Sequence, residues 1–187
     1  GFEPPEGNVD VFDLPELTLN AQSKVVHLAD HDVLNVNVDT KMHNDAIERL
    51  SLSGQSSAKK PFKIALNPEG TSVAVNSEDT TFLTEALGLQ SRLEGGTLKA
   101  SMEPLMRGRL TPETKLHLEM DQVTLKRAPI LGRILSLASL SGPLEILTGQ
   151  GMLMHNIRLD ARLGKETFFI DNLEMKNASL GIFFTGK

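Results

Sequence analysis

The hexapeptide LHLEMD at residues 116–121 has an apolar side chain at every second position and a polar one between. A period of two is the repeat of a β-strand, in which successive side chains point to opposite faces of a sheet. The same alternation occurs at residues 34–39, 62–66, 73–75 and 157–163, and about ten such runs are separated by short turns. A sheet with one apolar and one polar face is typically antiparallel. The pattern therefore predicts a mainly β chain built on a large antiparallel sheet.

The alternation changes phase at two places. Met120 and Val123 lie three residues apart, as do Met154 and Ile157. An odd spacing moves the apolar set to the other face unless a β-bulge absorbs one residue, and bulges bend a sheet. We therefore predict a bulge between the members of each pair, and we expect these bulges to curve the sheet.

Three segments have helical patterns. Residues 79–87 begin with an aspartate suited to the N-cap and end before a glycine, and residues 128–140 and 143–148 have a proline in the first turn. The segment 128–140 is apolar around most of its circumference, so it must be buried nearly all round or lie in lipid. Packing into the core is the plain interpretation, and a plug or end cap over the apolar face is the sharper one. Its apolar positions are Ile130, Leu131, Ile134, Leu135, Leu137 and Ala138.

Composition narrows the classes of function. The chain has 187 residues, a net charge of -5, and no Cys, Trp or Tyr. Without cysteine there is no disulfide, no cysteine-based zinc site and no thiol nucleophile. A negative chain without these stacking aromatics is poorly suited to nucleic acid, so no nucleic-acid partner is expected. We expect residues 1–187 to be a single segment excised from a longer extracytoplasmic protein.

The best candidate for a metal site is HLADHD at residues 27–32. His27 and His31 are four residues apart and would share one face of a helix. The valines on both sides favour strands instead, and the sequence marks no third ligand. We therefore interpret this segment as a polar turn and predict that His27, Asp30 and His31 perform no chemistry. Because no serine lies in a G-x-S-x-G motif and no glycine pair has the context of a phosphate loop, we expect no enzyme activity, no metal and no cofactor.

The segment around the long helix resembles a known family. It is similar to the C-terminal domain of AsmA-like proteins, a group that includes the YhdP- and TamB-type bacterial envelope proteins. The ending SLGIFFTG at residues 179–186 and the glycine pair after Asp79 also match the family, although Thr80 and Thr81 depart from its usual small-Gly pair. The resemblance is strongest over residues 71–187, and its main blocks are LKRAPIL at residues 125–131, LSLASLSG at residues 135–142 and LTGQGM at residues 147–152.

The resemblance implies a fold, a place and a function. The fold is a curved antiparallel sheet forming an open, β-taco-like groove, with two or three short helices capping or plugging it. The place is the periplasm of a Gram-negative bacterium, in a protein anchored in the inner membrane. The function is lipid transport in the cell envelope: binding or conducting phospholipid between the inner and outer membranes, in support of outer-membrane integrity. The alternative is a non-catalytic assembly or structural factor for envelope proteins.

An acyl chain needs a continuous apolar surface without specific polar contacts. About ten strands spaced about 4.8 Å apart would give a groove of roughly 45–50 Å. Near the polar rim of the long helix, Lys126, Arg127 and Arg133 are expected to meet a lipid phosphate or an anionic membrane surface. The side chains expected to line the groove and contact phospholipid or another acyl-chain lipid are Leu116, Leu118, Met120, Ile157, Leu159, Phe168, Ile170, Ile182 and Phe184.

Overall fold

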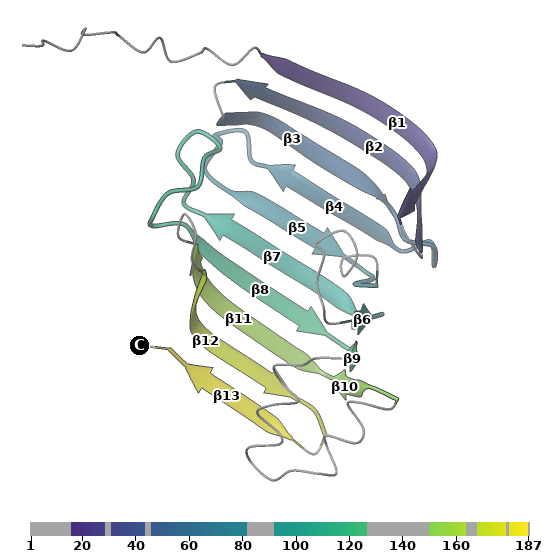
Figure 1. Cartoon of the computed structure of the whole chain (residues 1–187), viewed down its shortest axis with the longest axis vertical. Coiled ribbons are helices and arrows are strands. Elements are labelled where there is room, and N and C mark those ends of the chain that lie inside the picture. The colour runs from purple at the N-terminus through teal and green to yellow at the C-terminus, as the bar shows by residue number, and fades with distance from the viewer. Residues whose placement is uncertain are drawn as a thin grey trace, which may run out of the picture.

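A computed structural model describes residues 16–28, 31–43, 46–81, 92–126, 150–163, 168–178 and 180–186. Within these ranges the chain forms thirteen strands and no helix. Ten strands make one large sheet (Figure 1). In their order across that sheet they are β1 (Leu17–Leu28), β2 (His31–His43), β3 (Ala46–Gln55), β4 (Pro61–Leu66), β5 (Val73–Ser77), β7 (Thr97–Glu103), β8 (Lys115–Asp121), β11 (Asn156–Leu163), β12 (Phe168–Lys176) and β13 (Gly181–Thr185).

The large sheet is an open antiparallel meander. Each strand pairs with the one before it and the one after it in this order, and every pair is antiparallel. The strands β1 and β13 form its two edges. The predicted mainly β, antiparallel class is therefore confirmed.

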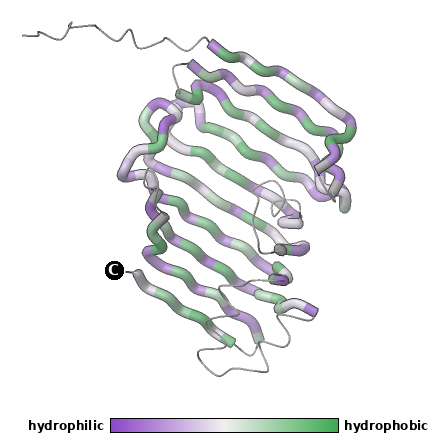
Figure 2. Tube along the Cα trace, in the orientation of Figure 1, coloured by the Kyte–Doolittle hydropathy of each residue, from purple (hydrophilic) through white to green (hydrophobic). Residues whose placement is uncertain are grey.

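The register sorts the side chains of the large sheet into two faces. Apolar and polar residues alternate along its strands, as the colours in Figure 2 show. One cross-strand line, here the apolar row, takes one apolar residue from each of the ten strands: Ala21, Val38, Leu52, Ile64, Val75, Ala100, Leu118, Leu159, Leu173 and Phe184. The neighbouring line, here the polar row, carries polar residues and two alanines: Asn20, Asp39, Ser51, Ala65, Ala74, Ser101, His117, Asp160, Asn172 and Thr185.

Three further strands form a small sheet that continues the large one past a bend. They are β6 (Arg92–Glu94), β9 (Val123–Lys126) and β10 (Met152–Met154), and β9 lies between the other two. One or two residues separate each of these strands from a strand of the large sheet. Gly95 and Gly96 lie between β6 and β7, Gln122 lies between β8 and β9, and His155 lies between β10 and β11. We call this line of four residues the crease.

The pairing keeps the same register on both sides of the crease. Met120 faces Ile157 before the bend and Val123 faces Met154 after it, so two residues separate the pairs on each strand. Neither strand of this pair has an extra residue at the crease, so the prediction of bulges is wrong. Instead three adjacent strands bend together: their pairing is interrupted at the crease and resumes beyond it in the same register.

The bend resolves the odd spacing of the apolar residues. Met120, from the apolar face of the large sheet, packs against the same cluster as Val123, which is fully buried. The small sheet therefore folds toward the apolar face. The buried cluster between the two sheets comprises Leu93, Val123, Leu125, Met152, Met154, Ile157 and Met175.

A second bend lies at the same margin, in the hairpin of β1 and β2. Asn35 has a φ of 50°, and the β2–β3 register shifts beside it. Val33 and Val36 are again three residues apart and again both buried. They join Phe62 and Leu98 in a second cluster, so this margin of the sheet curls inward near both bends.

The predicted helices lie mostly outside the described residues. This holds for all of 128–140 and 143–148 and for 82–87 of the first helix. The remaining part of the first helix, residues 79–81, is not helical. There Asp79 forms a local turn, in which its Oδ1 accepts hydrogen bonds from the backbone nitrogen of Thr81 at 3.0 Å and from the Thr81 hydroxyl at 2.6 Å.

Candidate functional site

The apolar face of the large sheet is the candidate site, because its side chains are only partly covered. No member of the apolar row is fully buried, and Phe184 at its end is 50% exposed. The two buried clusters both lie near the curled margin. Five members of the row pack against the second cluster and stay only partly buried: Val38, Leu52, Val75, Ala100 and Leu118. A surface of this kind can hold apolar groups without directional contacts.

The residues expected to line a groove share this face wherever the structure describes their side chains. On β8 and β11 the register sets Leu118 against Leu159 and Met120 against Ile157, and Leu116 precedes Leu118 by two residues. On the last two strands Leu173 faces Phe184 and Met175 faces Ile182, and Ile170 stands opposite Ala161. Phe168 pairs with Leu163 in the register, and its side chain lies outside what the structure describes.

These residues differ in how much of each is covered. Ile157 is buried, and Met120 and Ile182 pack against the cluster at the crease. Leu118 and Leu159, farther from the crease, are only half-buried. The face therefore has a covered end near the crease and an accessible remainder.

The sequence patterns led us to predict groove residues only in the C-terminal half of this surface. The apolar row continues through Val75, Ile64, Leu52 and Val38 to Ala21 at the edge strand β1. The signal for most of these residues was the same period-two alternation that marked Leu116 and Leu118. Applied to every run, it would have extended the surface across ten strands.

The expected cationic rim has one described member. The ammonium of Lys126 on β9 lies 2.7 Å from a carboxylate oxygen of Glu94 on β6, so its charge is balanced within the protein. Arg127 and Arg133 lie outside the described residues. The same holds for the predicted plug or cap helix, at Ile130, Leu131, Ile134, Leu135, Leu137 and Ala138.

The polar face carries a cross-strand cluster of charges. His117 Nδ1 lies 2.6 Å from Asp160 Oδ1, and Arg158 Nε lies 3.4 Å from a carboxylate oxygen of Glu119. The hydrogen bond with Asp160 raises the pKa of His117 above its usual value. The cluster joins β8 to β11 and stabilises their pairing.

The histidine segment forms part of the β1–β2 hairpin. His27 pairs with Asp32 across the two strands, and its Nδ1 lies 2.6 Å from the Asp32 carboxylate. Asp30 and the side chain of His31 lie outside what the structure describes. Within the described ranges, no group of three metal-ligating side chains comes together.

Comparisons of this chain with protein-family models, with curated proteins and with solved structures give no match. The resemblance to AsmA-like proteins therefore stays a prediction. Among the residues described, no helix has the length and apolar character needed to cross a membrane.

Proposed function

We propose that this protein is a non-enzymatic scaffold that binds or conducts phospholipid or another acyl-chain lipid along the apolar face of its sheet. The observation that carries this proposal is the apolar row, which runs without a polar interruption across ten strands. At about 4.8 Å per strand, such a row extends roughly 45 Å. A surface of that length accommodates an acyl chain. It makes no polar contact with the chain that would have to break as the chain moves.

The curled margin supports an open, β-taco-like groove as the shape of this surface. Bends at Asn35 and at the crease turn one margin toward the apolar face, so that the face becomes the inside of a trough. Acyl chains within a trough lose more contact with water than chains on a flat sheet, and apolar burial contributes about 25 cal/mol per Å².

The proposed setting follows the family resemblance. It is the periplasmic part of an inner-membrane-anchored protein in a Gram-negative bacterium, where phospholipid moves between inner and outer membranes and sustains outer-membrane integrity. Membrane contact is made through the full-length protein. In this setting the chain needs no cofactor, since moving a lipid along an apolar surface forms and breaks no covalent bond.

Site-specific photo-crosslinking in cells tests the proposal. A photoreactive amino acid at Leu118 or Leu159, on the apolar face, is expected to label with lipid. The same residue at His117 or Asp160, one position along each strand and on the polar face, serves as the matched control and is expected to label weakly. Equal labelling at the two sets contradicts a lipid-binding face.

A non-catalytic assembly or structural role for envelope proteins is the second candidate, and the edge strands favour it. The edge strand β13 has no partner strand on its outer side among the described residues. Its Phe183 and Phe184 are 66% and 50% exposed. An unpaired edge can accept a strand from another chain. Protein crosslinks at β13, without lipid crosslinks at Leu118, would favour this candidate.

A further inference from the structure

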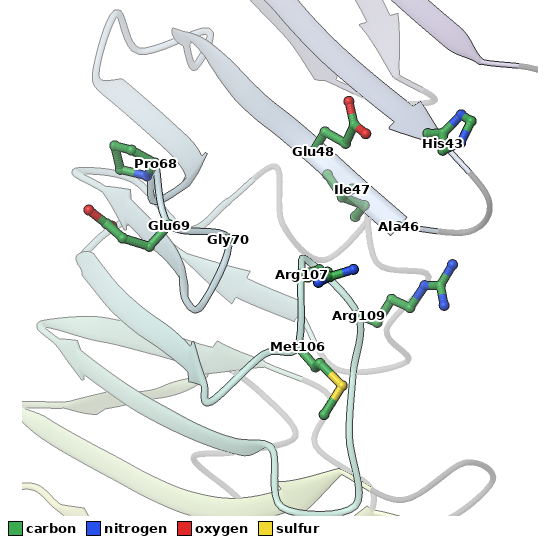
Figure 3. Close-up of a pocket in the computed structure, with 10 residues that line it drawn as sticks. All are labelled: His43, Ala46, Ile47, Glu48, Pro68, Glu69, Gly70, Met106, Arg107 and Arg109. Atoms are coloured by element: carbon green, nitrogen blue, oxygen red, sulfur yellow. The ribbon is translucent and has the colours of Figure 1, made fainter.

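A cavity of about 750 Å³ lies at the margin of the sheet opposite the crease. It lies where β2 ends and β3 begins, beside the turn between β4 and β5 and the loop between β7 and β8 (Figure 3). Two arginines, Arg107 and Arg109, reach it from that loop. The proposal of lipid binding on the apolar face makes no use of this cavity.

The arginines stand on a tight hairpin tip. Met106 and Arg109 exchange backbone hydrogen bonds of 3.0 and 3.1 Å, and the two residues between them, Arg107 and Gly108, have φ values of 51° and 73°. Two successive positive φ angles are typical of a type I′ turn, which holds its backbone in one conformation. The two guanidinium groups therefore start from a defined backbone.

The tip is also anchored against the sheet. The backbone nitrogen of Gly108 donates to the carbonyl of Gly70 at 2.8 Å. A Cβ at Gly108 would lie 1.9 Å from the carbonyl oxygen of Ile47, so the backbone of the tip rests directly on β3. Because the tip contacts both β3 and the β4–β5 turn, the backbone that carries the arginines is fixed beside the cavity, and their side chains are exposed.

The charge around the cavity favours an anion. Neither Arg107 nor Arg109 has an ion pair among the described residues. Glu48 also lines the cavity. Its carboxylate lies 3.0 Å from the ammonium of Lys41, which is shared with Glu16 at 3.2 Å, so Lys41 offsets the charge of Glu48 only in part. Glu69 is then the one acidic lining residue whose charge has no described partner, against two guanidinium groups.

The lining also has an apolar part, which includes Ile47, Pro68 and Met106. Pro68 follows the last residue of β4, Leu66, by two positions, and Leu66 lies on the apolar face. The cavity thus has a cationic part and an apolar part, and it lies at the end of a strand that contributes to the apolar face. A guanidinium binds a phosphate through two parallel hydrogen bonds, which a lysine cannot do.

We propose that this cavity binds a phosphate group through Arg107 and Arg109. The shared chemistry is a phosphate group, supplied either by a lipid headgroup or by free inorganic phosphate. A headgroup source rests on the proposed lipid-binding function, since acyl chains would then lie on the apolar face while the phosphate occupies the cavity.

Binding measurements on the purified protein test the site. Isothermal titration uses two probes: inorganic phosphate, and dihexanoyl phosphatidic acid below its micelle concentration. The double variant Arg107→Gln with Arg109→Gln is expected to bind both probes at least about tenfold more weakly, since two charge-assisted hydrogen bonds are lost. The variant Glu69→Gln is expected to bind both probes more tightly.

The matched control removes the same number of positive charges elsewhere. Lys63 and Lys99 are exposed on the polar face, and the double variant Lys63→Gln with Lys99→Gln is expected to bind like the wild type. An equal loss in both double variants, or no binding of either probe by the wild type, overturns the proposal. Melting temperatures close to the wild-type value establish that the variants are folded.

The two probes distinguish the source of the phosphate. Tighter binding of dihexanoyl phosphatidic acid than of inorganic phosphate assigns the site to a headgroup, and equal affinity assigns it to free phosphate. If phosphate binds here but Leu118 does not crosslink to lipid, the lipid-binding function fails while the site stands. If Leu118 crosslinks and neither probe depends on the arginines, the site fails alone.

Discussion

At the scale of single residues, two adjacent glycines in the crease make different contributions. Both have positive φ, 65° at Gly95 and 66° at Gly96. A Cβ at Gly95 would meet nothing within 4 Å, whereas one at Gly96 would lie 2.5 Å from the carbonyl oxygen of Asp121 on the neighbouring strand. Gly96 therefore permits a close approach of two backbones as well as an unusual conformation.

We expect Gly96→Ala to lower the free energy of unfolding by more than Gly95→Ala does. Alanine at Gly95 meets only the strain of a left-handed backbone, about 1 kcal/mol. Alanine at Gly96 adds a clash with a backbone atom that cannot move alone, for a total of about 2 kcal/mol or more. Denaturant unfolding of both variants measures this, and equal losses would mean that the two strands separate at little cost.

The pair of His117 and Asp160 predicts a dependence of stability on pH. Because the folded state raises the pKa of His117, the pair contributes fully below the unfolded value, about 6.5, and its contribution is lost as pH rises through the folded pKa. The side chain is half exposed, so we expect less than about 1 kcal/mol. The measurement is the free energy of unfolding between pH 5 and pH 8. In Asp160→Asn this slope should flatten, and an unchanged slope would assign it to other groups.

At the scale of elements, the short strand β10 is stabilised by one of its two faces. Met154 is fully buried in the cluster at the crease, and its neighbour Leu153 points the other way and is 46% exposed. We expect Met154→Ala to cost about 2–5 kcal/mol and Leu153→Ala to stay within about 0.5 kcal/mol. Thermal and denaturant unfolding compare them. Similar costs would mean that the small sheet does not pack as a layer on the large one.

The crease illustrates what a single sequence predicts and what it does not. The odd spacings of Met120 with Val123 and of Met154 with Ile157 correctly located the irregularity on two strands. The interpretation as bulges was wrong, because a bulge is judged from one strand and a crease depends on three neighbours bending at matching positions. Gly96 was available as a signal, yet its partner Gln122 has a φ of 54° although it is not a glycine.

The candidate site also has one part that the sequence predicts and another that it does not. Alternation alone identified Leu118 and Leu159 as members of one face, because neighbouring strands of a meander keep apolar residues in line. It gave no hint of the cavity at Arg107 and Arg109. That cavity depends on Gly108 resting on Ile47, some sixty positions earlier in the chain, a contact that no local pattern encodes.

At the scale of the whole molecule, the described residues do not bury the apolar face of the sheet along its full length. A sheet normally buries its apolar face against a second layer. Here the described residues supply that layer mainly at the curled margin, through the small sheet and the β1–β2 hairpin. The remaining apolar row is continuous but only half-buried. Such a surface stabilises the fold less than a packed core would, and it gains stability when an apolar ligand covers it.

The proposed conduction of lipid requires the row to be continuous, and a charge at its centre tests this requirement. Ala100 lies midway along the row between Val75 and Leu118 and is half-buried. We expect Ala100→Asp to remain folded, because its carboxylate can reach water. It should nevertheless lower lipid crosslinking at Leu118, since acyl chains avoid a charge. Ser101→Asp, one residue along on the polar row, is the control and should leave crosslinking unchanged. In cells, a permeability defect of the outer membrane that appears in both variants, or in neither, would contradict transport along this row.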